Sequence, residues 1–408
     1  MIGRGAGFAL AIPAALLTMT AVPARAQASG NQRFTGVPRI GSTDGWSLKP
    51  RGRVQYDVGD ISAPSGVAAA GLGTVDELRR ARLGVEGTAP GGISYVFEVE
   101  LAEGIAEITD ATLSWRASRT VTITAGQHNS FQSLEELTSS RFSSFIERAA
   151  FTDAFNFERR LGVSATITRG TITAQVGAFQ ENLLQIDEGD NQLSVDGRLV
   201  FAPRVGPTQF HLGVSAHWRD NGDLLARGTT TRYRQRPLLH ATDVRFVATP
   251  ALAVDRETSF GLEAAIVRGP FHAAAEAHWL NADRVAGADP TFFGFYVEGG
   301  WFLTGESRGY RGARFDRTRV RPGGAIEEGG FGAIQLNLRY DHLDLNSAGI
   351  TGGVQRGLQL GLTWIPTDHV RFLINYARLS YRDARIPASG GDRDYGVNVL
   401  GARAQIDF

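Results

Sequence analysis

The last residues of the chain alternate between apolar and mostly polar side chains and end in phenylalanine. The apolar face consists of Phe408, Ile406, Ala404, Ala402 and Leu400. The opposite face consists of Asp407, Gln405, Arg403, Gly401 and Val399. A period of two with one apolar face is typical of a β-strand that is wet on one side. A last strand that ends in an aromatic residue is typical of outer-membrane β-barrels, so this feature predicts compartment and fold together.

The first residues have the pattern of a secretory signal peptide. Arg4 supplies a positive region, residues 8–23 form an apolar run, and Ala24-Arg25-Ala26 is a cleavage motif. An N-terminal membrane anchor is the alternative, but the run is short and ends in that motif. We therefore expect a signal peptide at 1–26, a short periplasmic segment at 27–45 and an outer-membrane barrel domain at 46–408.

The charge balance gives no argument for nucleic-acid binding. The sequence has 42 basic and 42 acidic residues, and removal of Arg4 and Arg25 leaves 40 basic residues against 42 acidic ones. Lys49 is the only lysine, and arginine supplies every other fixed positive charge. Guanidinium groups stay charged and bind oxyanions through paired N–H groups. There is no cysteine, so disulfides, Cys-ligated metals and thiol nucleophiles are excluded.

The same alternation recurs along the chain and is clearest in residues 46–58. One face there carries Trp46, Leu48, Val54, Tyr56 and Val58. The other carries Lys49, Arg51, Arg53, Gln55 and Asp57. After the signal, no apolar run is long enough for a membrane helix, so a chain that spans a bilayer must close into a barrel. The expected strands are 46–58, 77–87, 93–103, 107–117, 120–128, 160–169, 171–181, 193–203, 208–219, 257–268, 271–281, 291–304, 331–345, 354–366, 369–382 and 395–408.

These sixteen strands predict an all-β fold, a 16-stranded antiparallel transmembrane β-barrel with an inward-folded helical third loop. Short connections follow even-numbered strands and long ones follow odd-numbered strands, except for the long segment 305–330. We exclude 239–248 as a strand, partly because it would make the count odd. All six tryptophans fall on the lipid-facing register, as aromatic girdles require. A soluble β-sandwich or propeller is the alternative, because the same alternation can build a core.

Residues 129–159 are too long for a plain loop and contain a helical pattern. Ser133 is a candidate N-cap, with Glu136 three residues later as in a capping box. Phe142, Phe145 and Ile146 continue an apolar stripe. Folding into the barrel mouth would bury this stripe and narrow the pore. A surface helix or a subunit contact is the alternative.

Two further connections are rich in arginine. Segment 220–256 and the residue before it carry Arg219, Arg227, Arg232, Arg234, Arg236 and Arg245. Segment 305–330 carries Arg308, Arg311, Arg314, Arg317, Arg319 and Arg321. Arginines at a pore constriction concentrate and select anions. Solvated loops that bind lipopolysaccharide phosphates or pair with acids are the alternative.

Basic residues also lie on the strands that would face the lumen. Arg80 and Arg82 share the lumen register with Glu86, whereas Arg79 enters the lumen only if its strand is bulged. Lys49, Arg51 and Arg53 would extend the positive field. The acids Glu98, Glu100 and Asp110 also lie on lumen registers, so the pore is not uniformly positive.

Several motifs together resemble the phosphate-selective porin O/P family of outer-membrane porins. They are LRRARLGV (78–85), SLEELTSSRF (133–142), IERA (146–149), RRLGV (159–163), RQRP (234–237) and FLTGESR (302–308). The resemblance implies a sixteen-stranded homotrimeric porin. Its lumen would be narrowed by the third loop, the fifth loop and a long periplasmic turn. It implies phosphate or polyphosphate binding at an arginine-rich constriction, with Arg79 and Arg80 matching a double arginine and Arg234 and Arg236 matching the R-x-R-P pair.

One position departs from that family pattern. Asn129, in Gln127-His-Asn-Ser-Phe131, stands where the family commonly has lysine. We expect a passive channel for small anions, phosphate or polyphosphate among them, with Arg79, Arg80, Arg82, Arg234, Arg236, Arg51, Arg53 and Lys49 as anion-binding or pore-lining residues. The alternatives are a porin for uncharged or carboxylate solutes without phosphate preference and, third, a plugged structural or adhesion barrel. We expect replacement of Arg234 and Arg236 by alanine to lower anion preference more than replacement of Arg51.

An enzyme is a weaker hypothesis. His128, Asn129 and Ser130 are residue types used by some outer-membrane phospholipases, but adjacent residues seldom reach the geometry of a triad. His211 and His217 lie about 20 Å apart along one strand, too far to share a metal ion. We expect no catalytic residues, no metal and no cofactor. The expected partners are small anions, outer-membrane lipid and lipopolysaccharide, and further copies of the chain, with no nucleic acid.

Overall fold

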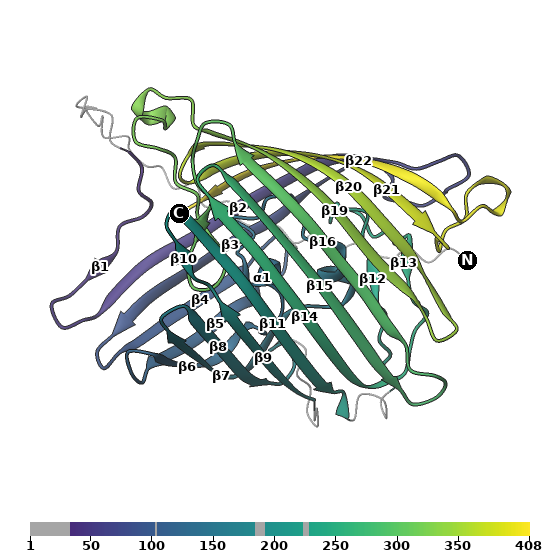
Figure 1. Ribbon diagram of the computed structural model, residues 1–408, viewed down its shortest axis with the longest axis horizontal. Helices are drawn as coiled ribbons and strands as arrows, with labels where there is room; N and C mark the ends of the chain where they lie inside the picture. Colours follow the sequence, from purple (N-terminus) through teal and green to yellow (C-terminus); the bar gives the residue numbers. More distant parts are fainter. Residues whose placement is uncertain (1–32, 103, 184–191, 223–227) are drawn as a thin grey trace, which may run out of the picture.

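The computed structural model describes residues 33–102, 104–183, 192–222 and 228–408. The predicted signal peptide 1–26 and Arg227 lie outside these residues. Sixteen antiparallel strands form a closed barrel (Figure 1), in which Val54 pairs with Ile406 and joins the first strand to the last. The strands are β2 (Ser47–Ser62), β3 (Gly73–Ala89), β4 (Ile93–Glu100), β5 (Glu107–Arg116), β6 (Val121–Asn129), β7 (Arg159–Arg169), β8 (Ile172–Phe179), β9 (Leu193–Phe201), β11 (Thr208–Asp220), β14 (Val254–Arg268), β15 (Phe271–Arg284), β16 (Thr291–Phe302), β19 (Ala333–Ser347), β20 (Ile350–Thr367), β21 (Val370–Arg382) and β22 (Tyr395–Asp407).

The predicted all-β class, the closed antiparallel barrel and the strand count are therefore confirmed. The other described elements are short: β1 (Ile40–Gly41), β10 (Arg204–Val205), β12 (Arg234–Gln235), β13 (Val247–Ala248), β17 (Gly309–Tyr310), β18 (Phe315–Asp316), α1 (Leu134–Leu137), α2 (Ala150–Ala154), η2 (Ile326–Glu328) and η3 (Ser389–Gly391). Of the excluded segment 239–248, only Val247–Ala248 is a strand, and it pairs with β12 rather than with the barrel. No helix in the described part of the chain is long and apolar enough to cross a membrane.

The alternation in the sequence decides which side chains face outward. In β22, Ile406 is 50% exposed, whereas Arg403 on the opposite register is 2% exposed. Apolar side chains on the outside and polar ones on the inside are the reverse of a soluble core and are what a lipid-facing barrel requires. The six tryptophans all lie on the outward register, and none of them is buried.

Short and long connections alternate between successive strands, as predicted from the sequence. Tight turns join β3 to β4, β7 to β8 and β14 to β15, whereas long segments join β6 to β7 and β11 to β14. The exception is again residues 303–332, a long connection at the end where the other turns are short. Outer-membrane barrels have short periplasmic turns and long extracellular loops, so this segment lies on the periplasmic side.

The first helix of the third loop, the connection 130–158 between β6 and β7, is shorter than the sequence pattern indicates. Ser133 is its N-cap, and its hydroxyl accepts the backbone N–H of Glu136 at 3.1 Å. The helix ends at Leu137, because the Arg148 guanidinium donates to the backbone carbonyls of 135, 136 and 138 at 3.0–3.1 Å. Those carbonyls would otherwise accept the next helical N–H groups. Phe145 is buried outside the helix.

Candidate functional site

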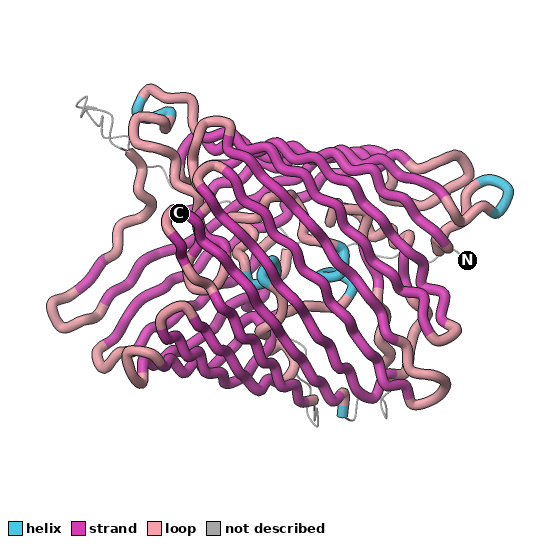
Figure 2. Tube along the Cα trace, in the orientation of Figure 1, coloured by secondary structure: helices cyan, strands magenta, loops and turns pink. Residues whose placement is uncertain are grey.

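Residues 130–158 contact the inner wall of the barrel. Backbone N–H groups of 134, 146 and 150 donate to carboxylate or amide oxygens on three strands at 2.6–3.0 Å. The acceptors are Glu276 on β15, Asn375 on β21 and Asp341 on β19. In Figure 2 the two helices of this segment, drawn in cyan, lie within the ring of strands. The contacts hold the segment against the wall opposite β3–β6.

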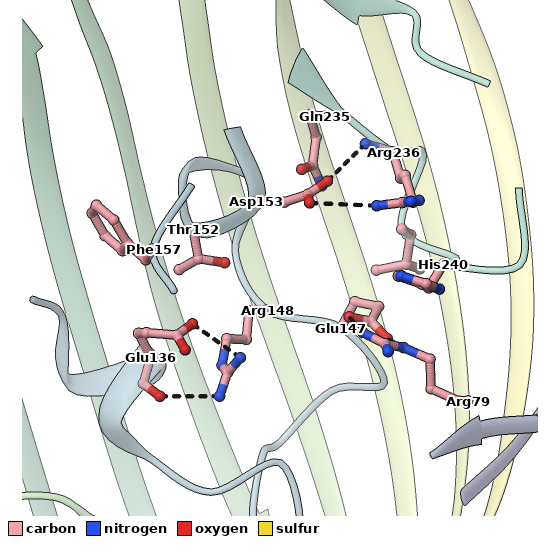
Figure 3. A pocket seen from close by; sticks show the side chains of 11 residues that line it. Arg79, Glu136, Glu147, Arg148, Thr152, Asp153, Phe157, Gln235, Arg236 and His240 are labelled. Carbon is pink, nitrogen blue, oxygen red and sulfur yellow. Dashed lines mark hydrogen bonds and ion pairs between the residues drawn. The ribbon is translucent and has the colours of Figure 1, made fainter. Parts of the chain in front are cut away.

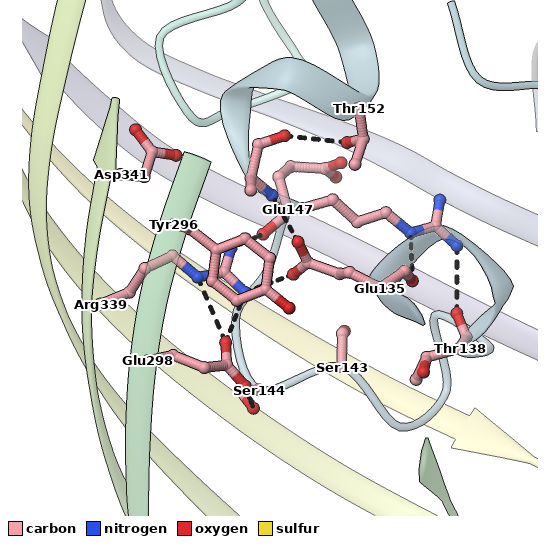
Figure 4. Close-up of polar contacts among 12 residues, drawn as sticks. Glu135, Thr138, Ser143, Ser144, Glu147, Thr152, Tyr296, Glu298, Arg339 and Asp341 are labelled. Carbon is pink, nitrogen blue, oxygen red and sulfur yellow. Dashed lines mark hydrogen bonds and ion pairs between the residues drawn. The ribbon is translucent and has the colours of Figure 1, made fainter. Parts of the chain in front are cut away.

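An ion-pair network anchors this segment. Arg339 on β19 donates to Glu298 on β16 at 2.6 Å and also pairs with Glu135 of α1 (Figure 4). Glu135 in turn accepts the Ala149 N–H at 2.9 Å, and Ser144 donates to Glu298 at 2.9 Å. Arg339, Glu135 and Glu298 are all buried. Removal of one partner would leave a buried charge unpaired, which is strongly destabilising.

Two other connections also contact inward-facing side chains. In the segment 221–253, Leu239 is buried beside Gly59 and Gly401, on the wall opposite β11 and β14. In the segment 303–332, Tyr310 hydrogen-bonds His211 at 2.7 Å and the Ala313 carbonyl accepts from Arg198 at 3.0 Å. The lumen is thus partly filled from both ends.

The space left between these segments and the wall contains a large cavity of about 620 Å³. Ten arginines and four carboxylates line this large cavity. The arginines are Arg51, Arg53, Arg80, Arg82, Arg141, Arg148, Arg159, Arg198, Arg311 and Arg314. The carboxylates are Glu86, Asp110, Glu136 and Asp316. The lining therefore has six more arginines than carboxylates, although Glu98, Glu100, Glu263 and Asp407, behind the lining, pair with five of these arginines.

Three of the arginines share one buried carboxylate. Glu98 accepts from Arg53 at 2.9 Å, from Arg51 at 3.1 Å and from Arg82 at 3.4 Å. Arg82 also pairs with Glu100 at 2.6 Å, and Arg51 with Glu86 at 3.4 Å. Glu98 fixes the positions of the three guanidinium groups, and with Glu86 and Glu100 three carboxylates balance the three cations.

Two arginines of the large cavity have no carboxylate partner within 4.0 Å among the described residues. Arg80 donates to the side-chain oxygen of Gln55 at 2.8 Å, and Arg314 donates to the Leu137 carbonyl at 3.5 Å. Arg314 is exposed to the large cavity, and its desolvation inside the barrel lowers its pKa, although nearby Asp316 opposes the shift. Burial likewise lowers the pKa of Arg141, against the effect of Asp407. Arginine normally titrates so far above neutral pH that a lowered value still leaves these groups charged.

Arg79 and Arg80 both point inward because of a β-bulge. Gln55 pairs with Arg80, but the next residue, Tyr56, pairs with Leu78, so Arg79 is the extra residue. The sequence predicted that Arg79 would face the lumen only if its strand is bulged, and the strand has this bulge. Leu78 keeps the outward register and is exposed.

The bulge sends the two arginines to different cavities. Arg79 lines a separate small cavity of about 130 Å³ (Figure 3) and pairs with Glu147 at 2.9 Å. Arg236 lies on the same small cavity and pairs with Asp153 at 3.5 Å and Asp243 at 3.6 Å. The ionised side chains on its lining are three arginines and three carboxylates: Arg79, Arg148, Arg236, Glu136, Glu147 and Asp153. Its charge is balanced.

One ion pair lies between the two cavities. Glu136 and Arg148, 2.9 Å apart, line both of them. Asn129 donates to the same Glu136 carboxylate at 2.9 Å. Burial raises the pKa of Glu136, whereas Arg148 and other arginines lower it by less.

The expected site residues therefore separate into groups. Arg51, Arg53, Arg80 and Arg82 meet on the large cavity, and Arg79 and Arg236 meet on the small one. Arg234 is exposed on β12 and Lys49 is half-buried opposite Glu86; neither lines these two cavities.

Six arginines of the large cavity were missing from the expected site. Arg198 could have been found, because it occupies the inward register of β9 with Ser194 and Asp196. Arg311 and Arg314 were noted only as part of a basic segment. Arg141, Arg148 and Arg159 lie in or beside the third loop, where periodicity does not indicate direction.

The residues of the hydrolase hypothesis are not arranged as a triad. His128 hydrogen-bonds the hydroxyl of Ser164 at 3.1 Å rather than that of Ser130, which is buried. Within the described residues, no group of three or more His, Asp or Glu side chains could hold a metal ion.

Comparison with known proteins agrees with the barrel fold. The family model described as phosphate-selective porin O and P matches residues 48–408. A Caulobacter vibrioides protein with no assigned function is 48% identical over 92% of this chain and 76% of its own length. Porin O of Pseudomonas aeruginosa is 26% identical over 86% of each chain.

Solved structures show the same fold at low sequence identity. The anion-selective porin from Comamonas acidovorans superposes with a TM-score of 0.57 at 13% identity, covering 89% of this chain and all of that one. OmpT of Vibrio cholerae, an outer membrane protein, gives 0.57 at 10% identity, covering 91% of this chain and all of that one. The barrel and these matches assign the protein to the bacterial outer membrane. The chain belongs to the phosphate-selective porin O and P family.

Proposed function

We propose that this porin is a passive channel for small anions, with the large cavity as its selective segment. The observation that carries the proposal is the lining of that cavity, with ten arginines against four carboxylates. Positive side chains in a narrow, partly desolvated passage raise the local anion concentration and exclude cations. No chemical step is needed, and the solute moves down its own gradient.

The arginines act by replacing part of an anion's hydration shell. Guanidinium groups donate paired hydrogen bonds that match the oxygens of phosphate and carboxylate. Arg80 and Arg314 are the best placed, because no carboxylate competes for them among the described residues. The Glu98 cluster of Arg51, Arg53 and Arg82 holds its cations more rigidly. Several moderate sites in sequence allow an ion to enter and still to leave.

The solute entering from outside would meet the small cavity first. Its arginines are each paired with a carboxylate, so it offers little net field. The Glu136–Arg148 pair then separates it from the large cavity. We propose that this pair is the narrow point of the path. Lys49 would add to the field toward the periplasm, and Arg234 would act at the mouth.

Phosphate and polyphosphate are the solutes suggested by the family name, and the large cavity offers oxyanion ligands suited to both. A porin without phosphate preference is the second candidate. Asn129 favours this second candidate. It lines the large cavity at the position where the family commonly has lysine, but it is uncharged and its amide donates a hydrogen bond to Glu136. We further propose a homotrimer with lipopolysaccharide around it; the trimeric form of OmpT is one fold neighbour.

The test is single-channel recording in a planar bilayer under a chloride gradient, with phosphate added in steps. We expect a reversal potential that reports anion preference and a chloride current that phosphate reduces. Anion preference without a phosphate effect would support the second candidate. Conductance without anion preference would contradict the selective role of the large cavity, and a closed channel would indicate a plugged structural barrel.

A further inference from the structure

Five arginines on the periplasmic rim are exposed, and within the described residues none of them has an ion-pair or side-chain hydrogen-bond partner. They lie in or beside four successive short turns. They are Arg116 and Arg119 between β5 and β6, Arg169 between β7 and β8, Arg204 between β9 and β11, and Arg268 between β14 and β15. We call this set the rim arginines. None of them lines either cavity, so anion selection within the lumen does not account for them.

The turns that carry the rim arginines contain no acidic residue. Residues 116–121, 168–173, 202–208 and 268–271 include no aspartate or glutamate. Each turn is two strands from the next, which is roughly 10 Å at the usual strand spacing. The rim arginines therefore form a continuous positive arc along one half of the rim.

The other half of the rim is also rich in arginine, but there the charges are paired. Asp368 pairs with Arg33 at 2.6 Å and with Arg319 at 3.3 Å. Glu306 pairs with Arg321 at 3.2 Å. Arg319 and Arg321 are exposed and nevertheless have carboxylate partners. Lack of a partner thus distinguishes the rim arginines from their neighbours.

Exposed apolar side chains lie directly beside the rim arginines. Arg169 pairs across its turn with Ile172, and Arg268 pairs across its turn with Phe271. Both apolar residues are exposed, and both arginines follow the outward register of their strands. In the other two turns the exposed apolar residue adjoins the arginine in sequence: Trp115 precedes Arg116, and Val205 follows Arg204. Each turn thus offers a cation at headgroup level and an apolar side chain at the edge of the lipid-facing band.

We propose that this arc binds anionic phospholipid in the inner leaflet of the outer membrane. The arginines would bind the lipid phosphate, and the apolar residues would contact the first part of the acyl chains. Basic clusters at a membrane surface attract anionic headgroups through the same forces. Zwitterionic lipid would bind less tightly, because its own amine offsets the phosphate charge.

The test is native mass spectrometry of the detergent-solubilised protein with added phosphatidylglycerol. The test variant carries Arg116→Gln, Arg119→Gln, Arg169→Gln, Arg204→Gln and Arg268→Gln. We expect its affinity for phosphatidylglycerol to fall at least about tenfold, and its affinity for phosphatidylethanolamine to change little. The matched control, Arg319→Gln with Arg321→Gln, removes exposed but paired arginines from the same rim. It should retain affinity within about twofold.

Two further measurements distinguish loss of lipid binding from loss of the folded barrel. Heat-modifiable gel mobility shows whether the variant is a folded barrel, and Arg169→Gln with Arg268→Gln alone provides a milder change that should still weaken binding. Equal affinity of the five-residue variant and the wild type would overturn the proposal. So would an equal loss in the control variant. Displacement of the lipid by inorganic phosphate, or a shifted reversal potential without a change in lipid binding, would assign the arc to permeating anions instead.

Discussion

The large and the small cavity have linings of the same residue types, yet their charges differ. The small cavity matches three arginines with three carboxylates, each arginine paired within 3.5 Å. The large cavity has six more arginines than carboxylates, and Arg80 and Arg314 have no carboxylate partner among the described residues. If the large cavity is the selective segment, as we propose, the number of arginines alone does not determine where anions bind. The number whose charge is not already compensated is the better guide.

Arg339→Ala should have the largest effect, because Arg339 anchors the third loop, which carries the Glu136–Arg148 pair between the two cavities. It leaves Glu135 and Glu298 buried without their shared cation, which costs about 3–5 kcal/mol. We expect the third loop to detach, conductance to rise and become noisy, and anion preference to fall. Single-channel recording measures all three. Arg356→Ala, which removes an exposed outward arginine from β20, is the control and should behave as wild type. A quiet channel of normal conductance in Arg339→Ala would contradict the anchoring role.

Arg80→Gln with Arg314→Gln should give the next largest effect, a fall in the anion-to-cation permeability ratio of about fivefold or more. Both charges act at short range inside the barrel, and among the described residues neither has a carboxylate within 4.0 Å. Reversal potentials under a chloride gradient measure the ratio. Arg79→Gln with Arg236→Gln is the matched control in the small cavity. If the control lowers the ratio as much, the distinction between the cavities is lost.

The structure also changes one expectation drawn from the sequence. Replacement of Arg234 and Arg236 was expected to lower anion preference more than replacement of Arg51. Arg234 lines neither cavity and Arg236 lines the small, charge-balanced one, whereas Arg51 lines the large cavity; Arg51 and Arg236 each have two carboxylate partners. We now expect the reverse order. Reversal potentials of Arg51→Ala and of the Arg234→Ala, Arg236→Ala double variant decide between the two orders.

Glu136→Gln should have a smaller effect, an anion preference raised by about twofold to threefold, because it frees Arg148 at the boundary of the cavities. The pKa of Glu136 is raised by burial, so its proton is taken up at a higher pH than that of an ordinary glutamate. As the pH falls through that value, wild-type anion preference should rise. In Glu136→Gln the same titration should leave the reversal potential flat. A slope retained in the variant would assign the titration to another group.

The fold could be predicted from the sequence because its signal is local. A period of two assigns each strand and its inward face without knowledge of its neighbours, which is why sixteen strands and their parity were recovered. The site depends on contacts between distant residues, such as Glu135 with Arg339 and Arg198 with Ala313. A loop with no fixed period does not indicate where its arginines point. Arg79 is an intermediate case. The sequence shows that Arg79 can face the lumen only if its strand is bulged, but it does not show whether the bulge forms.

Asn129→Lys tests whether phosphate binding follows from uncompensated charge. Asn129 lines the large cavity and donates to Glu136 at 2.9 Å, so a lysine there would meet the same carboxylate. It would then compete with Arg148 for Glu136 and free part of the Arg148 charge. We expect block by phosphate to strengthen about twofold to fivefold. Asn129→Gln is the control, because it keeps the amide without adding charge. If phosphate blocks the current equally in both variants, side-chain length rather than charge governs phosphate binding. Uncompensated charge would then not explain phosphate binding at this position.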